Sequence, residues 1–149
     1  MFEILNTVEI AGEKLPVKCD FNVLQVLQEE FGTLREFEQK LIGLVPIKDS
    51  EGNIIYETDN EGNESMKFKT TEPSLKAIAL VLPLMLKEGR RQADAQGDYT
   101  NKDFDYISAI KEADFDIVKL AIDLHTEYKR CYDRKKLKAH KSPATKTSR

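Results

Sequence analysis

The beginning of the chain alternates apolar and polar side chains, which is the period of a half-buried β-strand. The apolar positions form two runs, Phe2 to Ile10 and Leu15 to Cys19, separated by Ala11-Gly12-Glu13. This pattern predicts a β-hairpin that turns at those three residues. Pro16 has no backbone N–H to donate, so the second strand is expected at an edge that another copy could extend. One hairpin alone is only marginally stable, and we expect it to pack on helices.

The apolar period then changes to between three and four, the period of an amphipathic helix. A first helix is predicted from Phe21 to Phe31, between Asp20 as its N-cap and Gly32 as its stop. Thr33 and Glu36 have the spacing of a capping box, which opens a second, short helix that ends at the next glycine. Two short helices joined so closely are expected to form a compact corner.

From Val45 to Thr70 the pattern is polar and carries two near-copies of one turn sequence. Asp49-Ser50-Glu51-Gly52-Asn53 recurs as Asp59-Asn60-Glu61-Gly62-Asn63, with short apolar runs between and after the copies. We interpret the segment as a projecting β-hairpin or three-stranded meander inserted between helices. Calcium binding is disfavoured because, with Gly62 at the sixth position of a calcium loop, Phe68 stands at the twelfth, where a bidentate glutamate is required.

The most apolar segment, Leu75 to Leu86, predicts a helix with apolar residues on nearly every side. Such a helix lies either at the centre of a domain or in an assembly interface. Pro73 is expected in its first turn, Pro83 is expected to kink or break it, and Gly89 is expected to end it beside two arginines. The interface alternative gives a candidate partner surface: Leu82, Leu84, Met85, Leu86, Arg90 and Arg91.

Two further helices are predicted in the last third of the chain. Thr100 is expected to cap a helix that continues to Ile110, and Asp114 is expected to cap a longer one. This last helix is expected to fray near Lys138, which leaves residues 139–149 as a flexible basic tail.

These elements together predict an α+β fold that is mostly α-helical, with an N-terminal β-hairpin packed on a helical bundle. Residues 1–138 are expected to form a single domain from which the β insertion at 45–70 projects. A chain of 149 residues has the length of one domain and can bury about two-thirds of its unfolded surface.

Charge is distributed unevenly along the chain. The formal net charge is −3, but residues 129–149 hold nine Lys or Arg and one acidic residue, a local charge of +8. The rest of the chain therefore carries −11. An acidic body repels a polyanion, which disfavours nucleic acid as a partner. The basic end nevertheless supports an alternative function, a small regulator that binds nucleic acid through its C-terminal helix and tail.

Cysteine usage and hydropathy predict a cytoplasmic protein. Cys19 and Cys131 are far apart in the sequence and form no CxxC motif, so we expect two buried free thiols in a reducing compartment. The N-terminal segment holds Glu3, Glu9 and Glu13 and lacks the apolar run of a signal peptide. The apolar segment before Gly89 spans 12 residues, fewer than the roughly 18 that suggest a membrane span.

Residues with catalytic chemistry form no recognisable constellation. The sequence has neither glycine-rich phosphate-binding motif, and its two histidines, His125 and His140, lack metal-ligand spacing. Acid pairs such as Glu29-Glu30 are typical of helix caps and solvated faces. The sequence therefore predicts no enzyme, with no catalytic residue, no cofactor and no metal site.

The order of elements resembles the tail assembly chaperones of long-tailed bacteriophages and prophages. In that family a small strand pair precedes a helix of the D-F-N … E-E-F-G type, and a helix with a T-x-x-D/E cap follows an apolar one. The resemblance covers about residues 10–43 and 75–130. The segments that carry it are Gly12 to Asn22, Val23 to Phe31, Gly32 to Phe37, Leu75 to Gly89 and Tyr99 to Phe104.

The resemblance implies a non-enzymatic function in tail morphogenesis. Such chaperones coat the tape-measure protein, keep its hydrophobic surface from aggregating and help to recruit tail-tube subunits. Many are also made in a longer, frameshifted form. The insertion at 45–70 matches nothing in the family pattern, and its function stays open. Coating a long partner requires self-association as well as apolar surface, so a homo-oligomer is expected.

Overall fold

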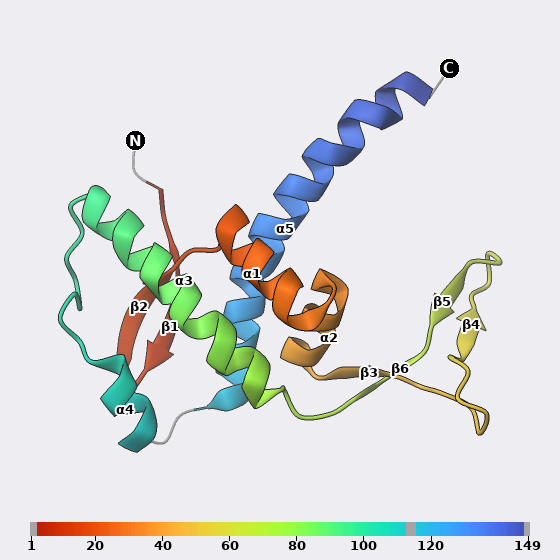
Figure 1. Ribbon diagram of the computed structural model, residues 1–149, viewed down its shortest axis with the longest axis horizontal. Helices are drawn as coiled ribbons and strands as arrows, with labels where there is room; N and C mark the ends of the chain where they lie inside the picture. The colour runs from red at the N-terminus through yellow and green to blue at the C-terminus, as the bar shows by residue number, and fades with distance from the viewer. Residues whose placement is uncertain (1–2, 113–115, 148–149) are drawn as a thin grey trace.

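In the computed structural model, residues 3–112 and 116–147 are described, with side chains through Arg134 (Figure 1). About half of the chain is helical, and the predicted α+β fold is confirmed. The elements follow in this order: β1 (Asn6–Ile10), β2 (Glu13–Val17), α1 (Phe21–Phe31), α2 (Leu34–Ile42), β3 (Leu44–Pro46), β4 (Tyr56–Thr58), β5 (Glu64–Met66), β6 (Phe68–Thr70), α3 (Leu75–Ala95), α4 (Tyr106–Glu112) and α5 (Ile117–Thr147).

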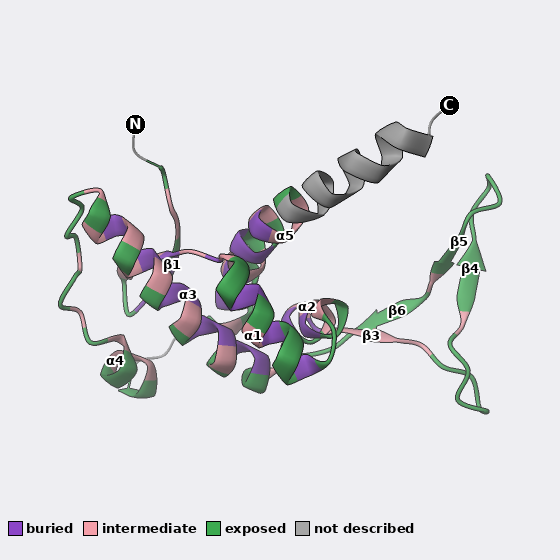
Figure 2. Cartoon of the chain, turned by 45° about the horizontal axis from the view of Figure 1, so that its top comes forward, coloured by how far each residue is buried: buried purple, intermediate pink, exposed green. Residues whose placement is uncertain are grey.

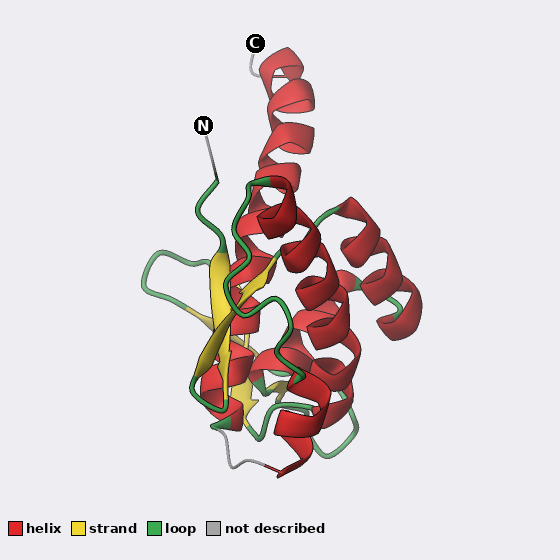
Figure 3. Cartoon of the chain, turned by 90° about the vertical axis from the view of Figure 1, so that its left-hand side faces the viewer, coloured by secondary structure: helices red, strands yellow, loops and turns green. Residues whose placement is uncertain are grey.

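The N-terminal hairpin forms as predicted. Strands β1 and β2 pair antiparallel with Val8 opposite Leu15, and Ala11 and Gly12 make the turn with positive φ angles of 53° and 81°. Apolar side chains on one face are buried against α3 and α5, while the other face is polar, as alternation requires. Figure 3 shows the two strands lying along the helices.

The caps of α1 and α2 are also those that the sequence predicts. The Asp20 carboxylate accepts the Val23 N–H at 2.9 Å, and the Thr33 hydroxyl accepts the Glu36 N–H at 3.0 Å. Each side-chain oxygen satisfies a backbone donor that the first helical turn leaves without a partner. The two helices meet at the predicted corner, where the rings of Phe31 and Phe37 are 5.4 Å apart.

The inserted segment projects from the body as a stem with two hairpin branches, and we call residues 44–70 the arm (Figures 1 and 2). Strands β3 and β6 pair to form the stem. Beyond it, three backbone bonds close a triangle: Ile47 N–H to Lys67 O at 2.9 Å, Lys67 N–H to Ile55 O at 3.0 Å, and Ile55 N–H to Ile47 O at 2.9 Å. The β insertion expected from the sequence is thus present, and this junction joins its stem to two short hairpins.

Both branches end in the repeated turn. Asp49 and Asp59 each accept two backbone N–H groups, from the second and fourth residues that follow, at 2.8 to 2.9 Å. The bonds from Asn53 and Asn63 are the first cause of the lowered pKa of these two carboxyl groups, because they favour the charged form. The repeat is thus explained by turn geometry.

Helix α3 differs from its prediction at three residues. Pro73 precedes the helix, because the Ser74 hydroxyl accepts the Ala77 N–H at 3.2 Å and acts as the cap. Pro83 lies inside an unbroken helix of 21 residues, on an exposed side where water can reach the backbone carbonyl that loses its donor. Gly89 does not end the helix, which continues to Ala95, and it is buried against β2.

The caps predicted for the last two helices are replaced by other aspartates. Asp105, rather than Thr100, caps α4 by accepting the Ser108 N–H at 3.1 Å, and the residues before it form turns. Asp114 lies outside the described residues, and Asp116 caps α5 by accepting the Lys119 N–H at 3.0 Å. The helical backbone continues beyond Lys138 to Thr147. Flexibility of residues 139–149 stays a prediction.

The core lies where α3 and α5 meet the hairpin and α1–α2. Its aromatic centre is Phe37, whose ring meets that of Tyr128 edge-on at 5.2 Å. Tyr128 in turn stacks on Tyr132 at 5.6 Å. In the part of the chain that the structure describes, no helix is long and apolar enough to cross a membrane.

Candidate functional site: a groove beside helix α3

The residues predicted as a partner surface lie on different sides of α3. Leu82, Met85 and Leu86 belong to the core, with 3%, 0% and 7% of their surface exposed, and Leu84 is half-buried. Within this chain α3 is therefore a central helix, the first of the two alternatives for an apolar helix. Of these six residues, only Leu84 and the two arginines keep surface that a partner can reach.

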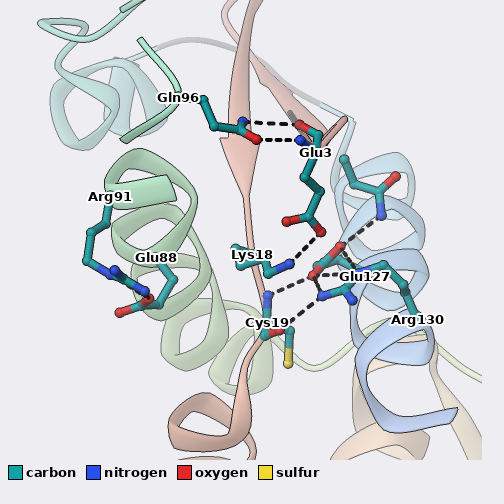
Figure 4. A network of polar contacts seen from close by, with 9 residues as sticks. Glu3, Lys18, Cys19, Glu88, Arg91, Gln96, Glu127 and Arg130 are labelled. Carbon is teal, nitrogen blue, oxygen red and sulfur yellow. Dashed lines mark hydrogen bonds and ion pairs between the residues drawn. The ribbon is translucent and has the colours of Figure 1, made fainter. Parts of the chain in front are cut away.

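The two arginines face different surroundings. Arg91 is exposed and pairs with Glu88 at 2.8 Å on the surface of α3 (Figure 4). Arg90 instead turns toward the loop that follows α3, where it donates to the carbonyls of Asp98 and Thr100 and pairs with Asp94 at 3.0 Å. Arg90 thus holds this loop against the helix.

The held loop and β2 enclose a groove along α3 with a volume of about 240 Å³, and we call it the α3 groove. Apolar side chains from four elements line its inner surface, and three cations stand among them. The lining residues are Leu15, Pro16, Pro83, Leu86, Lys87, Arg90, Asn101, Lys102, Phe104 and Tyr106. Pro83 is exposed on this side of α3, so the helix presents a rigid ring to the groove.

Two contacts fix the walls of the α3 groove. Asn101, whose φ angle is positive at 58°, donates from Nδ2 to the carbonyl of Lys14 at 2.9 Å. The Lys18 N–H donates to the Met85 carbonyl at 3.0 Å. The outer edge of β2 is thereby covered by α3 and its loop. The expectation that another copy extends the Pro16 edge is wrong, because this chain itself occupies that edge.

A buried carboxylate on α5 holds the joint between the hairpin and α1 (Figure 4). Glu127 is 1% exposed and accepts the Cys19 N–H at 2.7 Å and the Asn6 side-chain amide at 2.8 Å. It also pairs with Arg130, whose guanidinium donates to the Cys19 carbonyl at 3.0 Å. Both backbone groups of Cys19 are therefore bound by α5.

The N-terminal segment is attached to the same network. Glu3 pairs with Lys18 at 2.5 Å, and this hydrogen bond is the first cause of the lowered pKa of Glu3. Its backbone carbonyl accepts from Gln96 Nε2 at 3.1 Å, and its N–H donates back to Gln96 Oε1. These contacts join the first residues to the end of α3.

Both cysteines are buried thiols, as predicted, and they are neighbours. A hydrogen bond with Cys131 is the first cause of the raised pKa of Cys19, and burial is the second. We expect both thiols to react with iodoacetamide at pH 8 at least about 100-fold more slowly in the folded chain than in urea, because both are buried and the raised pKa of Cys19 also lowers its share of the reactive thiolate. Mass spectrometry of alkylated samples measures this, and rapid labelling of either native thiol would contradict it.

His125 contributes no site of its own. Its Nε2 lies 2.8 Å from a Glu38 carboxylate oxygen, and its ring stacks near Tyr128, so it links α5 to α2. Among the side chains that the structure describes, no group of three His, Cys, Asp or Glu is arranged to hold a metal ion.

Several groove residues escaped the sequence analysis, namely Lys87, Lys102, Phe104 and Tyr106. Two of them belong to the loop between α3 and α4, whose backbone Arg90 binds. Comparisons of the chain with protein-family models, with curated protein sequences and with solved structures find no match.

Proposed function

We propose that the protein is a non-enzymatic tail assembly chaperone of a long-tailed phage or prophage. It binds the tape-measure protein, helps to recruit tail-tube subunits and acts as a homo-oligomer in the host cytoplasm. The proposal is supported by the resemblance in the order of elements, from the hairpin and the D-F-N helix to the apolar helix. The observation that carries it in the structure is the α3 groove, an apolar depression with a cationic rim.

The groove is suited to a helical client. An amphipathic helix binds such a depression by placing a row of apolar side chains into it. The half-buried rings of Phe104 and Tyr106 provide contact area. Lys87 and Lys102 are exposed residues at the rim, and the Lys102 ammonium group lies 3.8 Å from the Asp94 carboxylate. A client helix with acidic residues beside its apolar row would complement this rim.

The alternative, a nucleic-acid-binding regulator, receives less support from the described part of α5. Lys129 pairs with Asp133 at 3.2 Å, and Arg130 pairs with Glu127. Tyr128 and Tyr132 stack on each other, and Tyr128 is fully buried, so it offers no ring to a base. Two of the cations that suggested this function are thus already matched by acids.

The neighbouring genes give a first test. A tail-tube gene upstream and a very long helical reading frame downstream would support the proposal. Their absence would count against it.

Co-expression with the product of that long reading frame tests the site. The wild-type chain is expected to raise the soluble fraction of this tape-measure protein, and K87E/K102E is expected to reduce the gain by at least about threefold, since it reverses the rim charge. K76E/K111E changes exposed lysines outside the groove and is the matched control. Equal activity of both variants would refute the groove as the site.

A further inference from the structure

The arm carries two sets of opposite charges that do not pair with each other. Residues 49–64, which form its two branches, include six acidic and no basic side chains. The cations gather where the arm meets the body, on the stem and on the neighbouring helix α2. Among the described residues, none of these charges takes part in an ion pair: Asp49, Glu51, Glu57, Asp59, Glu61, Glu64, Arg35, Lys40, Lys48, Lys67 and Lys69.

Three of these five cations line a second depression, of about 720 Å³, between α2 and the branches of the arm. We call it the stem groove. Its apolar part is formed by Val45, Pro46, Ile47, Ile54 and Met66. Arg35, Lys48 and Lys69 line it together with a single acid, Glu36. The stem groove is therefore complementary to a segment that carries both apolar and acidic side chains.

The branch formed by β4 and β5 has these two properties. Its turn carries Glu61 and the two strands that flank the turn carry Glu57 and Glu64, all exposed, and Tyr56 at the start of β4 is 55% exposed. The branch extends away from the body, and residues 57–65 do not line the groove of their own chain (Figures 1 and 2).

We propose that two copies of the chain bind each other reciprocally through their arms. The β4–β5 turn of each copy occupies the stem groove of the other, with Glu57, Glu61 and Glu64 next to Arg35, Lys48 and Lys69. A surface that carries both a site and its complement is satisfied by a two-fold partner, which makes every contact twice. A second copy carries both charge sets in the matching arrangement, whereas a polyanion would be repelled by the six acids of the same arm.

This inference deepens the homo-oligomer part of the proposed function and names its surface. It does not involve the α3 groove, and the two proposals fail separately. K87E/K102E is expected to dimerise like the wild type. Dimerisation is measured without any tape-measure protein, so its failure would leave the co-expression result unaffected.

Sedimentation velocity of the full chain, at about 0.05 M and about 0.5 M salt, tests the arm. The wild type is expected to form a dimer that weakens at the higher salt, where the screening length is shorter. The groove variant R35E/K48E/K69E and the turn variant E57K/E61K/E64K are each expected to weaken the dimer by at least about 100-fold. All six positions are exposed, so the body is expected to fold normally.

The decisive sample is an equimolar mixture of the two variants. Each supplies the charge that the other needs, so the mixture is expected to recover the dimer although neither variant forms it alone. A folding defect cannot produce this rescue. The control E29K/E30K/E112K, which reverses exposed acids on α1 and α4, is expected to dimerise like the wild type.

Four results would overturn the proposal. These are a monomeric wild type at millimolar concentration and low salt, variants that dimerise as well as the wild type, a mixture that stays monomeric, and assemblies that grow beyond the dimer through the arm.

Discussion

Replacing Gly89 with alanine is expected to lower the free energy of unfolding by about 3 kcal/mol, although alanine is the better helix former. A Cβ at this position would lie 2.2 Å from the Pro16 carbonyl oxygen and 2.7 Å from the Val17 Cα. These are backbone atoms, so β2 must move away from α3. That movement also weakens the hydrogen bond from Lys18 to the Met85 carbonyl.

Urea denaturation of the wild type and Gly89→Ala measures the effect. Gly97→Ala is the matched control, because its Cβ would meet no atom within 4 Å and only its φ of +80° opposes the change. We expect Gly97→Ala to lower the free energy of unfolding by about 1 kcal/mol. A Gly89→Ala chain as stable as the control would show that α3 and β2 do not approach so closely.

Replacing Glu127 with alanine is expected to lower the free energy of unfolding by about 3 kcal/mol, because three donor groups lose their acceptor at once. The Cys19 N–H and the Asn6 amide would lose their partner in a buried place, and Arg130 would lose its counter-charge. Glu127→Gln keeps the shape of the side chain, but it replaces one accepting oxygen with an NH₂ group that faces other hydrogen-bond donors. It is expected to recover only part of the loss.

The control for Glu127 is Glu88→Ala, which removes an ion pair from the surface of α3. Since Arg91 is largely exposed in that pair, we expect Glu88→Ala to change the free energy of unfolding by no more than about 0.5 kcal/mol. Thermal unfolding followed by circular dichroism compares the three variants. Similar losses for Glu127→Ala and Glu88→Ala would contradict the importance of the buried network.

The sequence predicted best the features that depend on neighbouring residues. Asp20 and Thr33 cap helices through bonds to N–H groups three residues ahead, and alternation alone places Val8 and Leu15 on the buried face of the hairpin. Such bonds form wherever the local chain is helical or extended. For this reason the fold class and the position of the β insertion were predictable.

Features that depend on distant segments were not predictable. Gly89 looked like a helix stop, but it serves the approach of a strand more than seventy residues earlier in the chain. Pro83 looked like a helix breaker, yet its exposed position makes the missing hydrogen bond tolerable. The α3 groove depends on bonds from Arg90 to backbone carbonyls of a loop. Because every residue has such a carbonyl, the sequence does not indicate which of them Arg90 binds.

The α5 contacts to Cys19 have a consequence for the order in which the chain is completed during translation. The hairpin and α1 are synthesised first, but the groups that hold their joint follow 108 and 111 residues later. A hairpin alone is marginal, so a nascent chain that stops before Glu127 cannot yet fix the hairpin against α1. The bonds that hold both backbone groups of Cys19 therefore form only after α5 has been made.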